Sequence, residues 1–169
     1  MAYAHWAAIY YPVEARFGCN SLVTALTLSI LKYSGSSPEI LKQYNLVRKG
    51  INLQTNWQGQ PSHSIYNSEH CHLCEWAKKQ RHIKCPDDNE FSSYCLECPL
   101  PLKCGSHLHS PWAIFIDTGD NEPIVTALIQ ALANNNIDDL VSKQSPFPEL
   151  HPFKDPNNQL KHLLRGAVS

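Results

Sequence analysis

Cysteine and histidine side chains are concentrated between residues 68 and 112, which hold six of the seven cysteines and five of the nine histidines in this 169-residue chain. Two pairs have C-x2-C spacing, Cys71 with Cys74 and Cys95 with Cys98, and twenty residues separate them. Two residues between thiolates allow a tight turn to bring both sulfurs to one ion, and the long insert allows the second pair to complete a tetrahedron. The spacing therefore predicts a closed, structural Zn²⁺ site.

This segment contains more metal-binding side chains than one zinc ion needs. Cys104 lies close enough to Cys98 to replace it, and Cys85 is a further surplus thiol. A histidine would also serve beside three thiolates. The histidine candidates are His70, His72, His82, His107 and His109. The identity of the fourth ligand therefore stays open.

The cysteines have three other interpretations. An iron–sulfur cluster is less favoured because the dense C-x2-C-x2-C run is absent, although Cys98-Pro99 matches the end of some cluster sequences. A thioredoxin-like redox pair would need an apolar strand before Cys71, and none is evident. Unligated cysteines in an ordinary core are the remaining alternative, and paired C-x2-C spacing argues against them.

Cys19 lies outside the cluster, immediately before a predicted helix. The helix dipole stabilises a thiolate at such a position, which is how many cysteine nucleophiles are activated. The stretch around Cys19 faintly resembles the nucleophile helix of papain-like and bacteriocin-processing peptidases. That resemblance implies a cysteine hydrolase with His107 or His109 as base and Asp117 as its orienting partner. A buried, inert cysteine is the commoner case, so hydrolysis is only an alternative function.

A basic stretch between the cysteine pairs suggests a second alternative. Its side chains are Trp76, Lys78, Lys79, Arg81 and Lys84. Lysine and arginine neutralise phosphates, and an exposed tryptophan offers a stacking face for bases of single-stranded nucleic acid. However, residues 69–104 carry five basic and six acidic side chains, so the segment has no net attraction for phosphate. A solvated helix face with Trp76 packed on the metal module is the favoured interpretation.

The composition and net charge of the chain limit the classes of protein to which it could belong. Hydrophobic residues make up 43% of the chain and charged residues 17%, which is typical of a globular protein. The formal net charge is −1, so no overall positive field favours nucleic acid or an anionic membrane. Because the N-terminal residues lack the features of a signal peptide and no apolar run is long enough to span a bilayer, we expect a cytoplasmic protein with no membrane partner.

The elements that would position the cysteines are mainly helical. Residues 20–34 predict a helix capped by Asn20 or Ser21, and a second helix is predicted to begin with Ser37 as its cap and Pro38 in its first turn. Residues 50–67 predict a loop or irregular hairpin, and Trp112 to Asp117 has the composition of a buried strand. A helix is predicted from Pro123. Its apolar face is formed by Ile124, Ala127, Leu128, Ala131 and Leu132.

These elements predict a mainly α protein with a small β element, an α+β fold in which a zinc-stapled module is inserted between helical segments. We expect a helical N-terminal part over residues 1–60 and the four-cysteine module over 61–112. A strand and an amphipathic helix would follow over 113–144, and a proline-rich arm over 145–169.

The order of motifs resembles small zinc-binding proteins of phage and prophage genomes. These proteins share a pattern of C-x-L-C, C-x-x-C-P, a further cysteine, Ser-Pro-Trp or Ser-Pro-Tyr, and a helix. Matching positions are Cys71, Leu73, Cys74, Cys95, Cys98, Pro99, Cys104, Ser110, Pro111 and Trp112. The match covers roughly residues 68–133, and this chain has a longer insert that carries Cys85. The resemblance implies a zinc module and a phage or mobile-element setting, but no reaction.

Zinc-stapled modules hold loops rigidly, and exposed aromatic residues are suitable anchors for a partner. We therefore expect a small zinc-binding adaptor or interaction protein that binds a protein partner rather than an enzyme. The nucleic-acid and hydrolase alternatives remain open.

Overall fold

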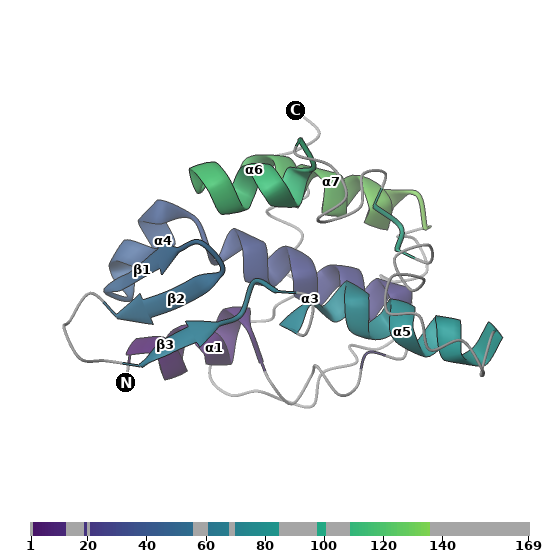
Figure 1. Cartoon of the computed structure of the whole chain (residues 1–169), viewed down its shortest axis with the longest axis horizontal. Helices are drawn as coiled ribbons and strands as arrows, with labels where there is room; N and C mark the ends of the chain where they lie inside the picture. Colours follow the sequence, from purple (N-terminus) through teal and green to yellow (C-terminus); the bar gives the residue numbers. More distant parts are fainter. Residues whose placement is uncertain are drawn as a thin grey trace.

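The computed structural model describes residues 2–12, 19, 21–55, 61–67, 70–84, 98–100 and 109–135. Its helices are α1 (Ala2–Tyr10), α3 (Leu22–Ser34), α4 (Pro38–Gln43), α5 (His72–Lys84), α6 (Pro111–Thr118) and α7 (Glu122–Ala133). Its strands are β1 (Leu46–Lys49), β2 (Asn52–Thr55) and β3 (Ser62–Ser64). The predicted fold class, mainly α with a small β element, is confirmed (Figure 1).

Helix α3 is the central element of the fold. It packs against α1, α5 and α7, and Figure 1 shows it running through the middle of the molecule. Ser21 caps its N-terminus by accepting a hydrogen bond from the backbone N–H of Thr24 at 3.0 Å. Leu26 and Ile30 are fully buried, as the apolar spacing of this helix predicts. The helix therefore forms one wall of the core.

The apolar face predicted for helix α7 is confirmed. It begins at Glu122, one residue before the expected Pro123, and Asn134 follows its last residue. Its five buried residues are the five predicted ones, Ile124, Ala127, Leu128, Ala131 and Leu132. The i, i+3, i+4 pattern identified this face correctly because α7 has one apolar side, which packs on α3 and α6.

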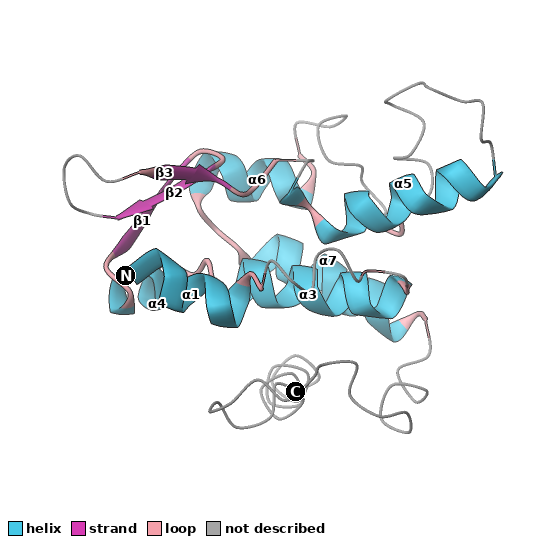
Figure 2. Cartoon of the chain, turned by 90° about the horizontal axis from the view of Figure 1, so that it is seen from below, coloured by secondary structure: helices cyan, strands magenta, loops and turns pink. Residues whose placement is uncertain are grey.

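The sheet has the order β1-β2-β3 with antiparallel neighbours. It lies at one end of the molecule, as Figure 2 shows. Lys49 pairs with Asn52, so a two-residue turn joins β1 to β2, and Gly50 in that turn has a φ of 55°. Glycine reaches this region without steric cost, which explains its place in the hairpin. The hairpin expected within residues 50–67 is realised by β2 and β3.

The strand predicted for Trp112 to Asp117 is wrong, because these residues form helix α6. Ser110 caps the helix by accepting from the backbone N–H of Ala113 at 3.1 Å, and Pro111 occupies its first turn. Gly119 ends the helix with a φ of 87°. These start and stop signals outweigh the β-propensity of the aromatic and β-branched residues between them.

Helix α1 was not predicted, and it closes the core beside the end of α3. Trp6 is fully buried, and its indole Nε1 donates to the carbonyl of Gly35 at 2.7 Å. A Cβ at Gly35 would collide with the ring of Tyr10, so this position accepts only glycine. The hydrogen bond and the close contact together fix α1 against the turn that follows α3.

None of the helices that the structure describes is long and apolar enough to cross a membrane. Parts of the predicted zinc module and all of the proline-rich arm over 145–169 lie outside the described residues.

Candidate metal centre

Cys71 and Cys74 lie at the N-terminus of α5. Cys71 immediately precedes the helix, and its carbonyl accepts the backbone N–H of Glu75 at 3.0 Å, the first hydrogen bond of the helix. Cys74 follows in the first turn. The first-turn N–H groups of a helix have no partner within the helix and point toward this end. The C-x2-C pair therefore lies where a helix best stabilises negative charge.

Three influences favour the thiolate form of Cys71. The largest is a hydrogen bond with the side chain of Cys74, and the ammonium of Lys32 and the backbone N–H groups of Leu73 and Cys74 act in the same direction. Burial opposes them. The balance lowers the pKa of Cys71 from 9.0 to about 6. Cys71 therefore favours the thiolate form more strongly than an ordinary cysteine does.

Lys32 is the cation that faces this site, and it comes from the middle of α3. Its side chain is fully buried. Its Nζ donates to the carbonyl of Ile65 at 3.0 Å and to the carbonyl of His70 at 2.8 Å. Because His70 directly precedes Cys71, Lys32 holds the backbone that leads into the C-x2-C pair.

Three tyrosine rings surround the Lys32 ammonium. The distances from Nζ to the ring centroids are 5.4 Å for Tyr11, 5.1 Å for Tyr33 and 5.8 Å for Tyr66. An ammonium over aromatic faces gains up to about 2 kcal/mol when it is removed from water. The rings and the two carbonyls offset part of the cost of burying this charge.

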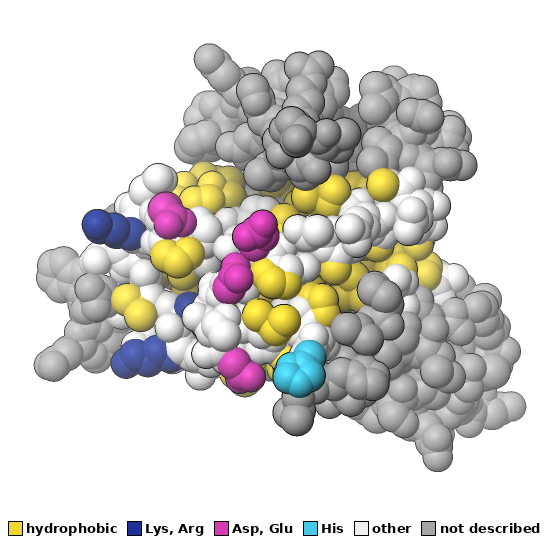
Figure 3. All heavy atoms as spheres, turned by 90° about the horizontal axis from the view of Figure 1, so that it is seen from above, with side chains coloured by type: hydrophobic (Ala, Val, Ile, Leu, Met, Phe, Trp, Pro, Cys, Tyr) yellow, Lys and Arg dark blue, Asp and Glu magenta, His cyan; other side chains and the backbone are white. Residues whose placement is uncertain are grey.

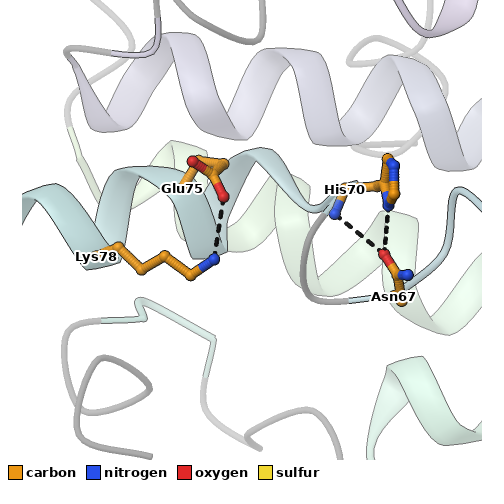
Figure 4. Close-up of polar contacts among 4 residues, drawn as sticks. All are labelled: Asn67, His70, Glu75 and Lys78. Atoms are coloured by element: carbon orange, nitrogen blue, oxygen red, sulfur yellow. Dashed lines mark hydrogen bonds and ion pairs between the residues drawn. The ribbon is translucent and has the colours of Figure 1, made fainter. Parts of the chain in front are cut away.

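His70 is a candidate imidazole ligand beside the cysteine pair. Figure 4 shows its backbone N–H and its Nδ1 both directed at the side-chain oxygen of Asn67, at 3.1 Å and 2.6 Å. An Nδ1–H donor leaves Nε2 in the form that metal-bound histidines use. The neighbouring His72 is fully buried and packs edge-on to Tyr11, with ring centroids 5.6 Å apart. His109 is exposed.

Cys98 is the one member of the second C-x2-C pair that the structure describes. It is partly buried and packs against the same hydrophobic core as Cys71. Cys95, the substitute Cys104 and the surplus Cys85 lie outside the described residues. Within the described part of the chain, no three metal-binding side chains group together. The predicted set of four ligands therefore stays a prediction.

Cys19 lies in the core close enough to Cys71 for the charge of Cys71 to act on it, although 51 residues separate them in the chain. Its side chain is fully buried, and burial is the largest cause that raises its pKa to about 11. The negative charges of Cys71 and Glu75 raise this pKa further, and Lys79 lowers it. Cys19 is thus protonated at neutral pH, and Ser21 rather than Cys19 caps α3. Both features disfavour Cys19 as a nucleophile.

The basic stretch proposed for nucleic acid lies on α5. Figure 4 shows Lys78 paired with Glu75 one turn earlier, at 3.1 Å. Trp76 is partly buried and packs against the hydrophobic core. Arg81 and Lys84 belong to the last turns of α5, but their side chains lie outside the description. The ion pair of Lys78 neutralises one positive charge, and the packing of Trp76 removes part of its ring from solvent. Both features weaken the hypothesis that this stretch of α5 binds single-stranded nucleic acid.

Comparisons with protein-family models, with curated proteins and with solved structures find no match for this chain.

The burial of Lys32 beside the cysteine pair was not predicted from the sequence. The available signal was its position one turn after Leu28, since residues at i and i+4 share a helix face and Leu28 is fully buried. A lysine on that face is normally assigned to solvent, because lysine is almost never fully buried without compensation.

The environment of Cys71 gives a prediction about its reactivity in metal-free protein. Because the thiolate is the reactive form, alkylation of Cys71 by iodoacetamide should be half-maximal near pH 6, while Cys19 stays unmodified at pH 7. Lys32→Met should raise the pKa of Cys71, because it removes a nearby positive charge. Mass spectrometry of the alkylated peptides across a pH series measures both.

Lys42→Met is the matched control, because Lys42 is exposed on α4. It should leave the Cys71 titration unchanged. Alkylation of wild-type Cys71 with a midpoint near 9.0, its ordinary value, would contradict the assignment.

Proposed function

We propose that this chain is a small zinc-binding adaptor protein, in which a structural Zn²⁺ ion fixes the start of α5 and the folded chain binds a protein partner. The observation that carries this proposal is the pair of thiols, Cys71 and Cys74, at the N-terminus of α5. Zinc binds thiolates and displaces their protons. A pKa lowered to about 6 at Cys71 therefore favours metal binding at neutral pH.

The residues present suit zinc. Thiolates are soft ligands that select zinc over magnesium or calcium, and imidazole is compatible with them. Cys71 and Cys74 would supply two ligands, Cys95 a third, and Cys98 or its substitute Cys104 the last. A site with four protein ligands has no open position, so it stabilises the fold and supplies no catalysis. The zinc would join α5 to the chain segment around Cys98, which lies 14 residues after the end of α5.

A protein partner is supported by the surface of α6 and α7. Figure 3 looks onto the side of the molecule where α6 and α7 lie and shows hydrophobic side chains between acidic ones there. Ile116, Val125 and Ile129 of α6 and α7 are only partly buried, and Asp117 and Glu122 on the same helices are exposed. Apolar residues within a polar rim are the usual composition of a protein interface. The resemblance to phage zinc-binding proteins is compatible with this proposal.

Metal analysis tests the zinc part of the proposal. Protein purified without chelator should contain about one equivalent of zinc. The Cys71→Ser/Cys74→Ser variant should lose it, because serine does not replace a thiolate ligand. Cys19→Ala is the matched control and should keep the zinc, since Cys19 is a protonated core residue. Less than about half an equivalent of zinc in the wild type would contradict the proposal.

Chemical cross-linking in the native cell tests the partner. The wild type should cross-link one protein in stoichiometric amount, and Ile129→Arg should lose it because the variant places a charge within the apolar surface. Gln130→Arg adds the same charge at the exposed neighbouring position and should keep the partner. Circular dichroism checks that both variants fold. Identical products from all three proteins, or recovery of nucleic acid alone, would contradict the proposed interface.

A further inference from the structure

A pocket of about 410 Å³ lies between α4, β1 and the C-terminal end of α6. Its volume is within the range of small-molecule sites, roughly 300 to 1,000 Å³. Leu41, Leu46 and Val47 give it an aliphatic wall, and Ser36 and Thr118 contribute hydroxyl groups. An apolar wall with a few polar groups is the common composition of such sites.

The charged side chains that line this pocket are both positive. Lys42 of α4 and Arg48 of β1 line it, and its lining residues include no acidic side chain. Figure 3 shows the lysine and arginine side chains gathered at the end of the molecule that carries α4 and the sheet. Neither Lys42 nor Arg48 forms a salt bridge with a described residue. Among the described residues, neither cation of the pocket is therefore held in an ion pair.

Hydrogen bonds from one nitrogen of the guanidinium group, Nη1, hold the side chain of Arg48 in place. Its Nη1 donates to the carbonyl of Gly50 at 2.7 Å and to the carbonyl of Ile116 at 3.0 Å. The guanidinium carbon lies 4.6 Å from the ring centroid of Phe115. These contacts fix the plane of the guanidinium group while the described residues accept no hydrogen bond from Nε or Nη2. A guanidinium fixed in this way is preorganised to bind an oxyanion.

Gly119 keeps the other side of the guanidinium open. A Cβ at this position would lie 3.1 Å from Nη2 of Arg48, which is tighter than ordinary contact. The positive φ of Gly119 also favours glycine. Burial lowers the pKa of Arg48, which shows that the cation is partly removed from water. A bound anion would compensate for that lost solvation.

We propose that this pocket binds a small molecule through an oxyanion group, a phosphate or a carboxylate. Arg48 binds the oxyanion through Nε and Nη2, and Lys42 adds a second positive charge at the rim. The aliphatic wall contacts the organic part of the ligand. This site is independent of the zinc proposal, because none of its lining residues lies in the cysteine segment.

Amide NMR titrations of the full chain at constant ionic strength test the proposal. The probes are inorganic phosphate, glycerol 3-phosphate and succinate, with uncharged glycerol as the reference. Saturable shifts should be confined to residues near 41–48 and 118–119, and glycerol should cause none. Stronger binding of glycerol 3-phosphate than of succinate would identify the group as phosphate, and the reverse order would identify it as carboxylate.

Three variants separate binding from structure. Arg48→Gln should abolish the shifts, but it also removes the contacts to Gly50 and Ile116, so circular dichroism must show that it folds. Lys42→Gln should weaken binding at least about threefold without affecting the fold, because Lys42 is exposed. Lys49→Gln removes the same charge from an exposed residue outside the pocket and should leave binding unchanged.

Two outcomes would overturn the proposal. One is the absence of saturable shifts with all charged probes up to about 10 mM, which would make Arg48 a structural bridge only. The other is equal weakening by Lys42→Gln and Lys49→Gln, which would show that the anions respond to overall charge and not to this pocket.

Discussion

The arrangement around the cysteines depends on the buried positive charge of Lys32 and on the groups that stabilise it. Removing a charge from water costs several kcal/mol, and two carbonyls and three tyrosine rings offset only part of that cost. The thiolate of Cys71 supplies negative charge nearby. The central helix α3 and the cysteine pair are thus coupled electrostatically, because Lys32 of α3 faces Cys71.

Much of the helical frame could be predicted from the sequence because local signals and tertiary packing agree there. Ser21 and Ser37 cap α3 and α4 as expected, and both side chains accept the predicted backbone hydrogen bonds. The buried face of α7 follows its apolar spacing residue for residue. The cysteine spacing likewise located a pair of thiols that the structure places together at the start of one helix.

The remaining features depend on competing or long-range effects. Helix α6 was predicted as a strand because its aromatic and β-branched residues were weighed above the Ser-Pro start and the glycine stop. The burial of Lys32 and the proximity of Cys19 to Cys71 depend on how α3 packs against α5, which no local pattern specifies. The pocket at Arg48 also combines residues from α4, β1 and α6 that are distant in the chain.

The most direct test of this electrostatic coupling is the pH dependence of stability in metal-free protein. The unfolding free energies of wild type and Cys71→Ser should be compared by urea denaturation. A thiol whose pKa is lowered by folding contributes stability that is fully present above its ordinary pKa of 9.0 and is lost as the pH falls through about 6. The account predicts that the advantage of the wild type is largest near pH 9 and decreases steadily toward pH 6. An advantage that does not change with pH would contradict it.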